Sequence, residues 1–143
     1  MPDILHTFPI RAAANRVFDA IVSPHSLDNW WTKRSAGKPA LGETYTLWFG
    51  PEYDWRGSVT RCETGRLFEW TITAAADDGL GTRVGFALEE HDGVTTVRFY
   101  HAGWKEASEH YCISNCCWAM YLRILRRNVE FGEVVPDEAR LDA

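Results

Sequence analysis

The side chain best suited by type and position to chemistry is the imidazole of His101, which ends an alternating run of apolar and polar residues. Side chains of an extended strand alternate between two faces, so His101 points to the same side as Val97 and Phe99. An imidazole at the rim of an aromatic cavity can orient a ligand by a hydrogen bond or move a proton near neutral pH. The alternative is a structural histidine bonded to a neighbouring backbone group, and the sequence leaves both open.

Five further aromatic residues are candidates for the wall of a binding site. Tyr45, Trp70 and Tyr121 combine apolar rings with O–H or N–H groups that can donate to a ligand. The alternative for these three is core packing, with their polar tips bonded inside the protein. Trp30 and Trp31 are adjacent in a short helical stretch, and we expect one of them to anchor that helix and the other to face a pocket.

Three cysteines in one predicted helix, Cys112, Cys116 and Cys117, lie near His110. Thiolates and imidazoles bind zinc, but a structural zinc site needs four ligands that converge. Residues four apart share a helix face, whereas Cys117 lies about 100° further round, so these groups diverge. A disulfide between Cys112 and Cys116 would strain a regular helix. We therefore interpret the cysteines as free thiols and predict no metal site.

Other patterns typical of catalysis are not found in the sequence. No two carboxylates are placed to flank a substrate. There is no glycine-rich phosphate loop, no G-x-S-x-G turn and no dinucleotide-binding fingerprint. The sequence therefore predicts no cofactor and favours binding without catalysis over an enzyme.

Length and charge exclude several classes of protein. A chain of 143 residues suits one domain that needs no disulfide to fold. The net charge of −5 argues against a nucleic-acid partner, which needs an excess of Lys and Arg. Arg123, Arg126 and Arg127 alternate with Glu130 and are interpreted as a solvated helix face. No apolar stretch approaches the ~20 residues of a membrane span and no secretion signal is recognised, which predicts a cytoplasmic protein.

Hydrophobic patterns predict the elements that must position these residues. Alternation predicts a strand over residues 4–10, and helical spacing predicts a helix over 14–21 and a short helix over 24–31, followed by a loop over 32–42. Five alternating runs between turn residues predict an antiparallel meander over 43–49, 55–62, 66–73, 82–89 and 94–101. A long helix over 108–131 ends at Gly132.

The faces of these elements predict how they pack. One face of the sheet carries bulky apolar residues and the other carries polar residues, Glu69 among them. The long helix has an apolar arc of about 200° that includes Ile113, which is wide enough to contact a curved sheet on both sides.

The residues that carry a family resemblance keep a characteristic order: 17–21 with Leu27 and Trp30-Trp31, then 57–59, 81–84, 95–97 and 101–104, then Trp118 with Leu122 and Leu125, and 130–132. In this order they resemble the START/Bet v-like superfamily, also called SRPBCC, over residues 4–132. Within it the chain is similar to the activator of heat-shock protein 90 ATPase homologue family. Two features depart from that pattern. Residues 12–14 are alanines where Pro or Ser is usual at the start of the first helix, and Cys117 stands where many relatives have Gly, which predicts a narrower cavity or a shifted helix.

The resemblance implies an α+β helix-grip fold, in which a curved antiparallel sheet wraps around a long C-terminal helix and two short N-terminal helices close one end. It also implies an apolar pocket. It implies no single activity, because this superfamily includes lipid carriers, cyclases, hydrolases and co-chaperone domains.

These observations lead to one main hypothesis. Residues 1–143 are predicted to form a single domain with a peripheral tail over 133–143, which binds a small hydrophobic or aromatic molecule between the sheet and the long helix. The predicted lining is Trp30, Tyr45, Phe49, Val59, Phe68, Trp70, Phe86, Phe99, His101, Trp118, Tyr121, Leu122 and Leu125.

Two other functions stay open. The first is an enzyme of the same fold that uses His101 as acid or base on an aromatic or polyketide-like substrate. The second is a protein-interaction or co-chaperone-like module. A homodimer is also left open.

Overall fold

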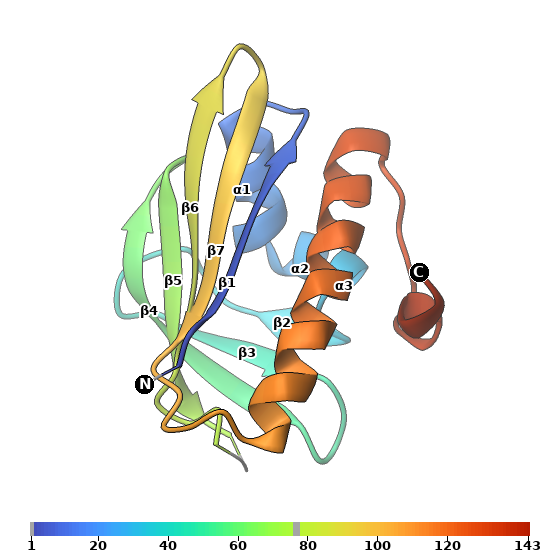
Figure 1. Ribbon diagram of the computed structural model, residues 1–143. Helices are drawn as coiled ribbons and strands as arrows, with labels where there is room; N and C mark the ends of the chain where they lie inside the picture. Colours follow the sequence, from blue (N-terminus) through green and yellow to red (C-terminus); the bar gives the residue numbers. More distant parts are fainter. Residues whose placement is uncertain (1, 76–77) are drawn as a thin grey trace.

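The fold is built on one curved antiparallel sheet, shown by the computed structural model, which describes residues 2–75 and 78–143 (Figure 1). Within these residues seven strands run in the spatial order β1-β7-β6-β5-β4-β3-β2. They are β1 (Ile4–Ile10), β2 (Arg34–Ala36), β3 (Thr44–Trp48), β4 (Asp54–Glu63), β5 (Leu67–Ala74), β6 (Arg83–His91) and β7 (Val94–Ala102). Ile4 pairs with His101, so the start of the chain extends the sheet beside its last strand.

The helices occupy the concave side of this sheet. They are α1 (Ala14–Val22), α2 (Pro24–Trp30) and α3 (Glu109–Phe131), and a 3-10 helix, η1 (Asp137–Asp142), follows. Figure 1 shows α3 running along the sheet beside β1, with α1 and α2 behind it. The predicted helix-grip fold is therefore confirmed.

Local signals set the helix ends. Ser108 is the N-cap of α3, and its hydroxyl accepts a hydrogen bond from the backbone N–H of Tyr111. Gly132 ends α3 in the left-handed conformation with φ of 71°, which glycine adopts without a Cβ penalty. Pro24 begins α2, where its missing N–H costs nothing. Ala13 gives α1 no side-chain cap, so α1 depends on tertiary packing of its apolar face.

The predicted loop over 32–42 is wrong at three residues. Arg34–Ala36 form β2, in which Ser35 pairs with Leu47 of β3. The Ser35 hydroxyl also lies 2.8 Å from the Asp28 carboxylate and 2.9 Å from the Pro24 carbonyl of α2, and its one proton is shared between these two acceptors. Three residues are too few to show alternation, and partners distant in sequence, rather than local propensity, make this segment a strand.

The curvature of the sheet is concentrated in β4. Its register with β5 shifts between Arg56 and Gly57 and again between Val59 and Arg61, and such bulges bend a strand and increase its twist. Gly57 faces inward between these shifts. A Cβ there would lie 3.1–3.2 Å from atoms of the Trp70 side chain, so the glycine makes room for this indole.

The outer face of the sheet holds a buried carboxylate. Glu69 lies on the predicted polar face, yet only 4% of it is exposed. Its carboxylate accepts hydrogen bonds from the hydroxyls of Thr60 at 2.6 Å and Tyr100 at 2.5 Å. The Tyr100 ring reaches Glu69 by lying across Gly85, where an added Cβ would be 2.1 Å from the ring. Glu69 is therefore shielded by its neighbours on the sheet surface.

The buried surface of α3 is narrower than its sequence predicts. Its buried residues are Trp118, Leu122, Ile124, Leu125 and Val129, which belong to its middle and C-terminal part. Ile113, in the predicted apolar arc, is 55% exposed. The prediction of contact on both sides is therefore wrong for the N-terminal part of α3.

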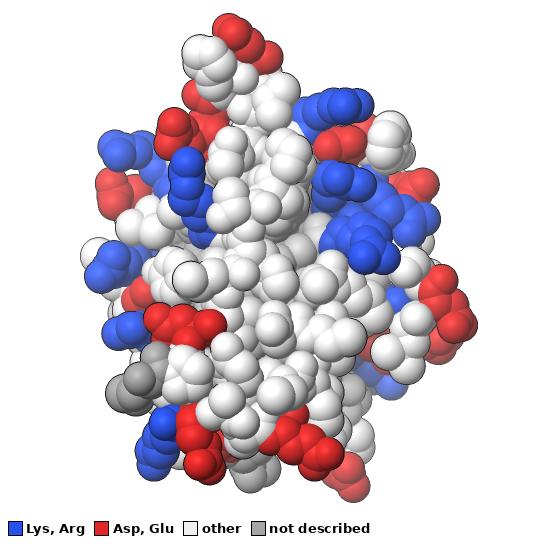
Figure 2. Space-filling model, in the orientation of Figure 1, with Lys and Arg blue, Asp and Glu red and all other residues white. Residues whose placement is uncertain are grey.

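Charges are unevenly spread over the face that presents β1 and α3 (Figure 2). Lys and Arg side chains gather over the C-terminal half of α3, and a largely uncharged strip runs beside them over β1.

Candidate functional site

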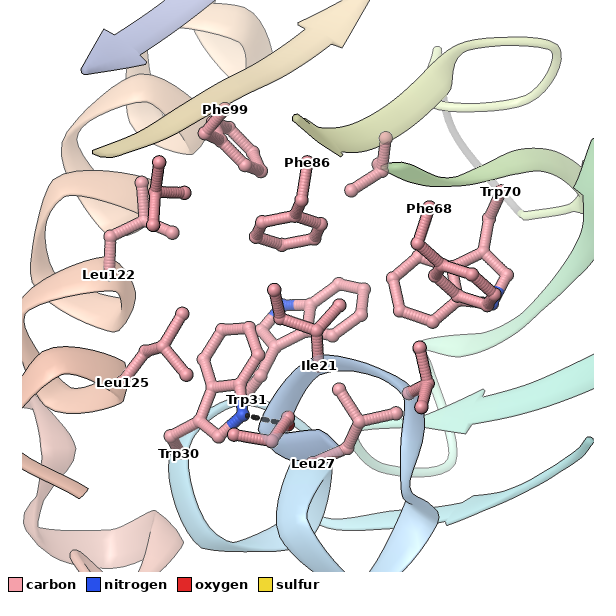
Figure 3. Packing of buried hydrophobic residues seen from close by; sticks show 14 of the residues in the cluster. Ile21, Leu27, Trp30, Trp31, Phe68, Trp70, Phe86, Phe99, Leu122 and Leu125 are labelled. Atoms are coloured by element: carbon pink, nitrogen blue, oxygen red, sulfur yellow. Dashed lines mark hydrogen bonds between the residues drawn. The ribbon is translucent and has the colours of Figure 1, made fainter. Parts of the chain in front are cut away.

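The residues predicted to line a cavity lie together in the interior between the sheet and the helices (Figure 3). The buried ones are Trp30, Tyr45, Val59, Phe68, Trp70, Phe86, Phe99, His101, Trp118, Leu122 and Leu125, and the half-buried ones are Phe49 and Tyr121. Alternation along the strands brings every second residue to the concave face, which α3 then covers.

The rings of this interior are in direct contact with one another. Ring centroids are 4.4 Å apart for Phe99 and Trp118, 4.8 Å for Phe68 and Trp70, and 5.1 Å for Phe86 and Phe99. These separations are typical of tilted and edge-to-face aromatic packing. A flat molecule that entered here would replace ring–ring contacts by contacts of the same kind.

The two adjacent tryptophans take different places. The indole N–H of Trp30 donates to the carbonyl of Ala20 at 2.9 Å and so fastens α2 to α1. The Trp31 ring lies at the centre of the aromatic interior, 5.0 Å from Trp118 and 5.7 Å from Trp70 between centroids. Trp30 therefore anchors α2 to α1, and Trp31 packs among the aromatic rings of the interior.

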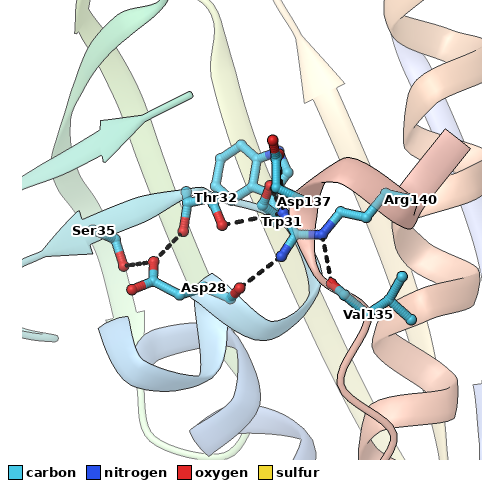
Figure 4. Close-up of polar contacts among 7 residues, drawn as sticks. All are labelled: Asp28, Trp31, Thr32, Ser35, Val135, Asp137 and Arg140. Atoms are coloured by element: carbon cyan, nitrogen blue, oxygen red, sulfur yellow. Dashed lines mark hydrogen bonds and ion pairs between the residues drawn. The ribbon is translucent and has the colours of Figure 1, made fainter. Parts of the chain in front are cut away.

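The C-terminal tail holds the Trp31 segment in place (Figure 4). The Arg140 guanidinium donates to the carbonyls of Asp28 at 2.6 Å, Trp31 at 2.7 Å, Thr32 at 3.1 Å and Val135 at 3.0 Å. The tail was expected to be peripheral, and most of it is exposed, but Arg140 is only 2% exposed. This residue satisfies carbonyl groups at the end of α2 that would otherwise lack donors.

His101 is hydrogen-bonded through both of its ring nitrogens. The Trp118 indole N–H donates to Nδ1 of His101 at 3.0 Å, and Nε2 lies 2.7 Å from the Thr82 hydroxyl. Because an indole is only a donor, Nδ1 must carry a lone pair, and the ring proton must be on Nε2. Nε2–H then donates to Thr82, whose hydroxyl donates to the Gly79 carbonyl at 2.5 Å. Both ring nitrogens of His101 thus have protein partners.

Burial holds His101 in its neutral form. The residue is fully buried, and desolvation, with a smaller contribution from the charge of His110, lowers its pKa from 6.5 to about 3. Protonation would also set a second N–H against the donor of Trp118. His101 therefore positions Trp118. An acid–base catalyst would titrate near neutral pH, and His101 does not.

Three buried indole N–H groups have no hydrogen-bond partner among the described residues: those of Trp55, Trp70 and Trp104. Trp55 and Trp104 flank His101, with centroid separations of 6.5 Å and 4.7 Å. A buried polar group without a partner costs roughly 1–3 kcal/mol. Three such buried donors therefore lie in the same aromatic interior.

The described residues contain no group of three or more His, Cys, Asp or Glu side chains arranged to hold a metal ion. Cys62, Cys112, Cys116 and Cys117 are free thiols. At the start of α3 the Asp78 carboxylate pairs with His110 and accepts from the Ser108 hydroxyl, which lowers the pKa of Asp78. The Ser108 hydroxyl thus donates to a carboxylate whose lowered pKa makes it a weak base, poorly suited to activate the hydroxyl as a nucleophile.

A family model described as Activator of Hsp90 ATPase homolog 1-like protein matches residues 11–130. The chain belongs to this family. No relative is found among the curated protein sequences. In residues 2–75 and 78–143 every helix is too short or too polar to cross a membrane.

Solved structures confirm the fold of this family member. The Aha1 dimer from Colwellia psychrerythraea is 27% identical, with a TM-score of 0.84, over 92% of this chain and 98% of that one. Protein BH1534 from Bacillus halodurans is 23% identical, with a TM-score of 0.76, over 91% and 98%. Protein SSP2350 from Staphylococcus saprophyticus is 18% identical, with a TM-score of 0.77, over 94% and 96%.

The sequence analysis did not identify four buried residues of this protein, Trp55, Thr82, Trp104 and Arg140, as part of the site. Trp55 precedes Gly57 and Val59 on the inward face of β4, so alternation could have identified it. Trp104 and Thr82 lie outside the regular strands, and Arg140 lies in the tail. Thr82 has the same parity as Val84 and Phe86 in the alternating run over 82–89, so alternation could have identified it as well. No periodic signal exists at Trp104 or Arg140, and only the tertiary structure brings these two to the site.

Proposed function

We propose that this protein binds a small, flat, mostly apolar molecule that carries hydrogen-bond acceptors, in the aromatic interior between the sheet and α3. The observation that carries the proposal is the set of unpartnered indole donors of Trp55, Trp70 and Trp104. An acceptor on the ligand would recover the free energy that each buried donor otherwise loses.

The interior supplies the other requirements of such a site. Its rings offer faces and edges for a flat molecule, and their burial provides the apolar driving force. The Trp31 ring contacts the rings of both Trp70 and Trp118. The rings of Trp55 and Trp104 both contact His101. A ligand of one or two rings could therefore contact more than one of the donors.

Binding without catalysis is supported over the enzyme alternative by the state of His101. A general base needs a free lone pair, and a general acid needs a transferable proton close to the substrate. The lone pair of Nδ1 is used by Trp118 and the proton of Nε2 by Thr82. The role we propose for His101 is to fix the orientation of Trp118 at the wall of the site.

Two probes of the same shape test the proposal. Acetylnaphthalene has a carbonyl acceptor, whereas ethylnaphthalene has none, so the difference in their affinities reports a hydrogen bond from the protein. We expect acetylnaphthalene to bind about fivefold more tightly, the equivalent of about 1 kcal/mol for one hydrogen bond. Quenching of the tryptophan fluorescence measures both affinities.

Single Trp→Phe substitutions at Trp55, Trp70 and Trp104 remove one donor each and keep an aromatic ring. The advantage of acetylnaphthalene is expected to disappear in at least one of them, and Trp30→Phe is the matched control because its N–H is already bonded to Ala20. Equal affinities of the two probes for the unmodified protein, or no binding of either above solvent controls, would refute the proposal. Native mass spectrometry of gently purified protein then identifies a retained ligand by its added mass.

We also propose that the protein forms a homodimer, because its 27% identical relative from Colwellia psychrerythraea is described as a dimer. The chain has a mass of 16.3 kDa, so light scattering after size exclusion distinguishes one chain from two. A mass that stays at one chain up to high protein concentration would contradict the dimer.

A further inference from the structure

A groove on the surface separates β1 from the C-terminal half of α3. Its volume is about 210 Å³, and it is lined by His6, Thr7, Phe8, Ala119, Leu122, Arg123 and Arg126. We propose that this groove is a second binding site, which takes a small amphipathic anion. The carboxylate, sulfonate or phosphate of that molecule would lie against Arg123 and Arg126, and its apolar part on Leu122 and Phe8.

The charge of the groove comes from two arginines on one helix face. Arg123 and Arg126 are three residues apart, so they are neighbours on the surface of α3. Neither is in an ion pair within 4.0 Å among the described residues, whereas Arg127 pairs with Glu133 at 2.5 Å. Two like charges at this spacing repel each other, and an anion placed between them relieves the repulsion.

The sequence interpretation of this cluster as a solvated face that alternates with Glu130 agrees with the exposure of Arg123 and Arg126. The carboxylate of Glu130 accepts a hydrogen bond from the backbone N–H of Arg11 at 2.9 Å. Glu130 is thus directed toward the segment that precedes α1 and not toward Arg126. Figure 2 shows the resulting group of basic side chains beside the uncharged strip over β1.

The floor of the groove is apolar and continuous with the core. Leu122 is 3% exposed and belongs to the buried cluster, and Phe8 is half-buried and packs against that cluster. Ala119 leaves space because its side chain is small. A hydrogen bond of 3.0 Å between Nε2 of His6 and the side-chain oxygen of Asn115 fastens β1 to α3 at one end of the groove.

The two arginines, the apolar floor and the volume of the groove together define the class of ligand. Two guanidinium groups beside an apolar floor favour a molecule that is anionic at one end and apolar at the other. The groove is smaller than the roughly 300 Å³ at which pockets for drug-sized ligands begin. The ligand is therefore small, with one or two rings or a short aliphatic chain.

A matched pair of fluorescent probes tests this site. Anilinonaphthalene sulfonate and N-phenylnaphthylamine share the same ring system, but only the first carries a negative charge. In the double variant Arg123→Gln and Arg126→Gln we expect the affinity for the sulfonate to fall by about tenfold, since two charge-assisted contacts are lost. The affinity for the neutral probe is expected to stay within about twofold, and Arg83→Gln, an exposed arginine outside the groove, is the control.

Ala119→Leu tests the apolar floor without changing the charge. Ala119 is exposed on α3, where leucine is a good helix former, so the variant folds and fills the groove. We expect this variant also to lose most of its affinity for the sulfonate, and decanoate, but not inorganic phosphate, to displace the sulfonate from the unmodified protein. Circular dichroism verifies that each variant is folded.

Three results would overturn the inference: unchanged sulfonate affinity in the double arginine variant, unchanged affinity in Ala119→Leu, or displacement by inorganic phosphate as effective as by decanoate. The last result would mean an anion site without an apolar part. These outcomes are independent of the proposed function, because binding of acetylnaphthalene in the interior does not require Arg123 or Arg126.

Discussion

Acidification is expected to destabilise this protein through His101, a fully buried and neutral imidazole. Its folded-state pKa is lowered from 6.5 to about 3, mainly because burial penalises the charged form. For a group with a depressed folded-state pKa, the unfolded chain takes up the proton first. The stability that neutral His101 contributes is therefore complete above pH 6.5 and is lost as the pH falls toward 3.

The magnitude follows from this shift. The unfolded state is half protonated at this position at pH 6.5 and almost fully protonated below about pH 5.5, whereas the folded state stays neutral down to about pH 4. Each pH unit with a full proton of difference costs about 1.4 kcal/mol, so acidification from about pH 7 to about pH 4.5 costs about 2.5 kcal/mol. That is a large part of the roughly 5–15 kcal/mol by which a domain is stable.

The assay compares the unmodified protein with His101→Gln. A glutamine cannot titrate, yet its amide offers one acceptor and one donor toward Trp118 and Thr82. Urea unfolding is followed by tryptophan fluorescence from about pH 7 down to about pH 4.5, within the range where two-state treatment holds. The other four histidines occur in both proteins, so they cancel in the difference between the two free energies of unfolding.

We expect the variant to be the less stable protein at neutral pH and to lose less stability on acidification, by about 2.5 kcal/mol at the acid end. A difference between the two proteins that stays constant with pH, within about 0.5 kcal/mol, would refute the reasoning. It would mean that His101 accepts its proton equally well in the folded and unfolded states. Nitrogen chemical shifts of the ring provide a second check, since the hydrogen bonds require the proton on Nε2.

Two further predictions concern single side chains. Trp30→Phe removes the hydrogen bond to Ala20, whereas Trp70→Phe removes an N–H that has no partner. We expect Trp30→Phe to lower the free energy of unfolding in urea by about 1–2 kcal/mol more than Trp70→Phe does. Equal losses would contradict the assignment of the Trp70 N–H as an unpartnered donor. Arg140→Ala removes four hydrogen bonds and is expected to cost about 1–3 kcal/mol, with faster proteolysis of the tail. Arg140→Lys is expected not to restore stability, because an ammonium lacks the planar fork of a guanidinium, and full rescue by lysine would show that charge alone is sufficient.

The sequence determined the fold through periodic patterns. Alternation identified six of the seven described strands, and helical spacing with Ser108 and Gly132 identified α3 to within a residue. These signals are local, since strand side chains alternate with period two and helix ends need particular capping residues. The same alternation placed Tyr45, Trp70 and Phe99 on the inward face, where the structure finds them.

The tertiary structure alone decided features that depend on partners far apart in the chain. β2 exists because β3 and α2 bind it, and Glu69 is shielded because Tyr100 lies across Gly85. Neither leaves a periodic signal in the sequence.

The chemistry of the site was also decided by tertiary contacts. The sequence placed His101 on the inward face, but its protonation state depends on Trp118 and Thr82, which the fold brings to its two nitrogens. Likewise Arg123 and Arg126 were visible as charges, but the groove beside them is formed only when α3 packs next to β1. Hydrogen-bond partners, burial and the space between elements are properties of packed surfaces, so one-dimensional patterns cannot contain them.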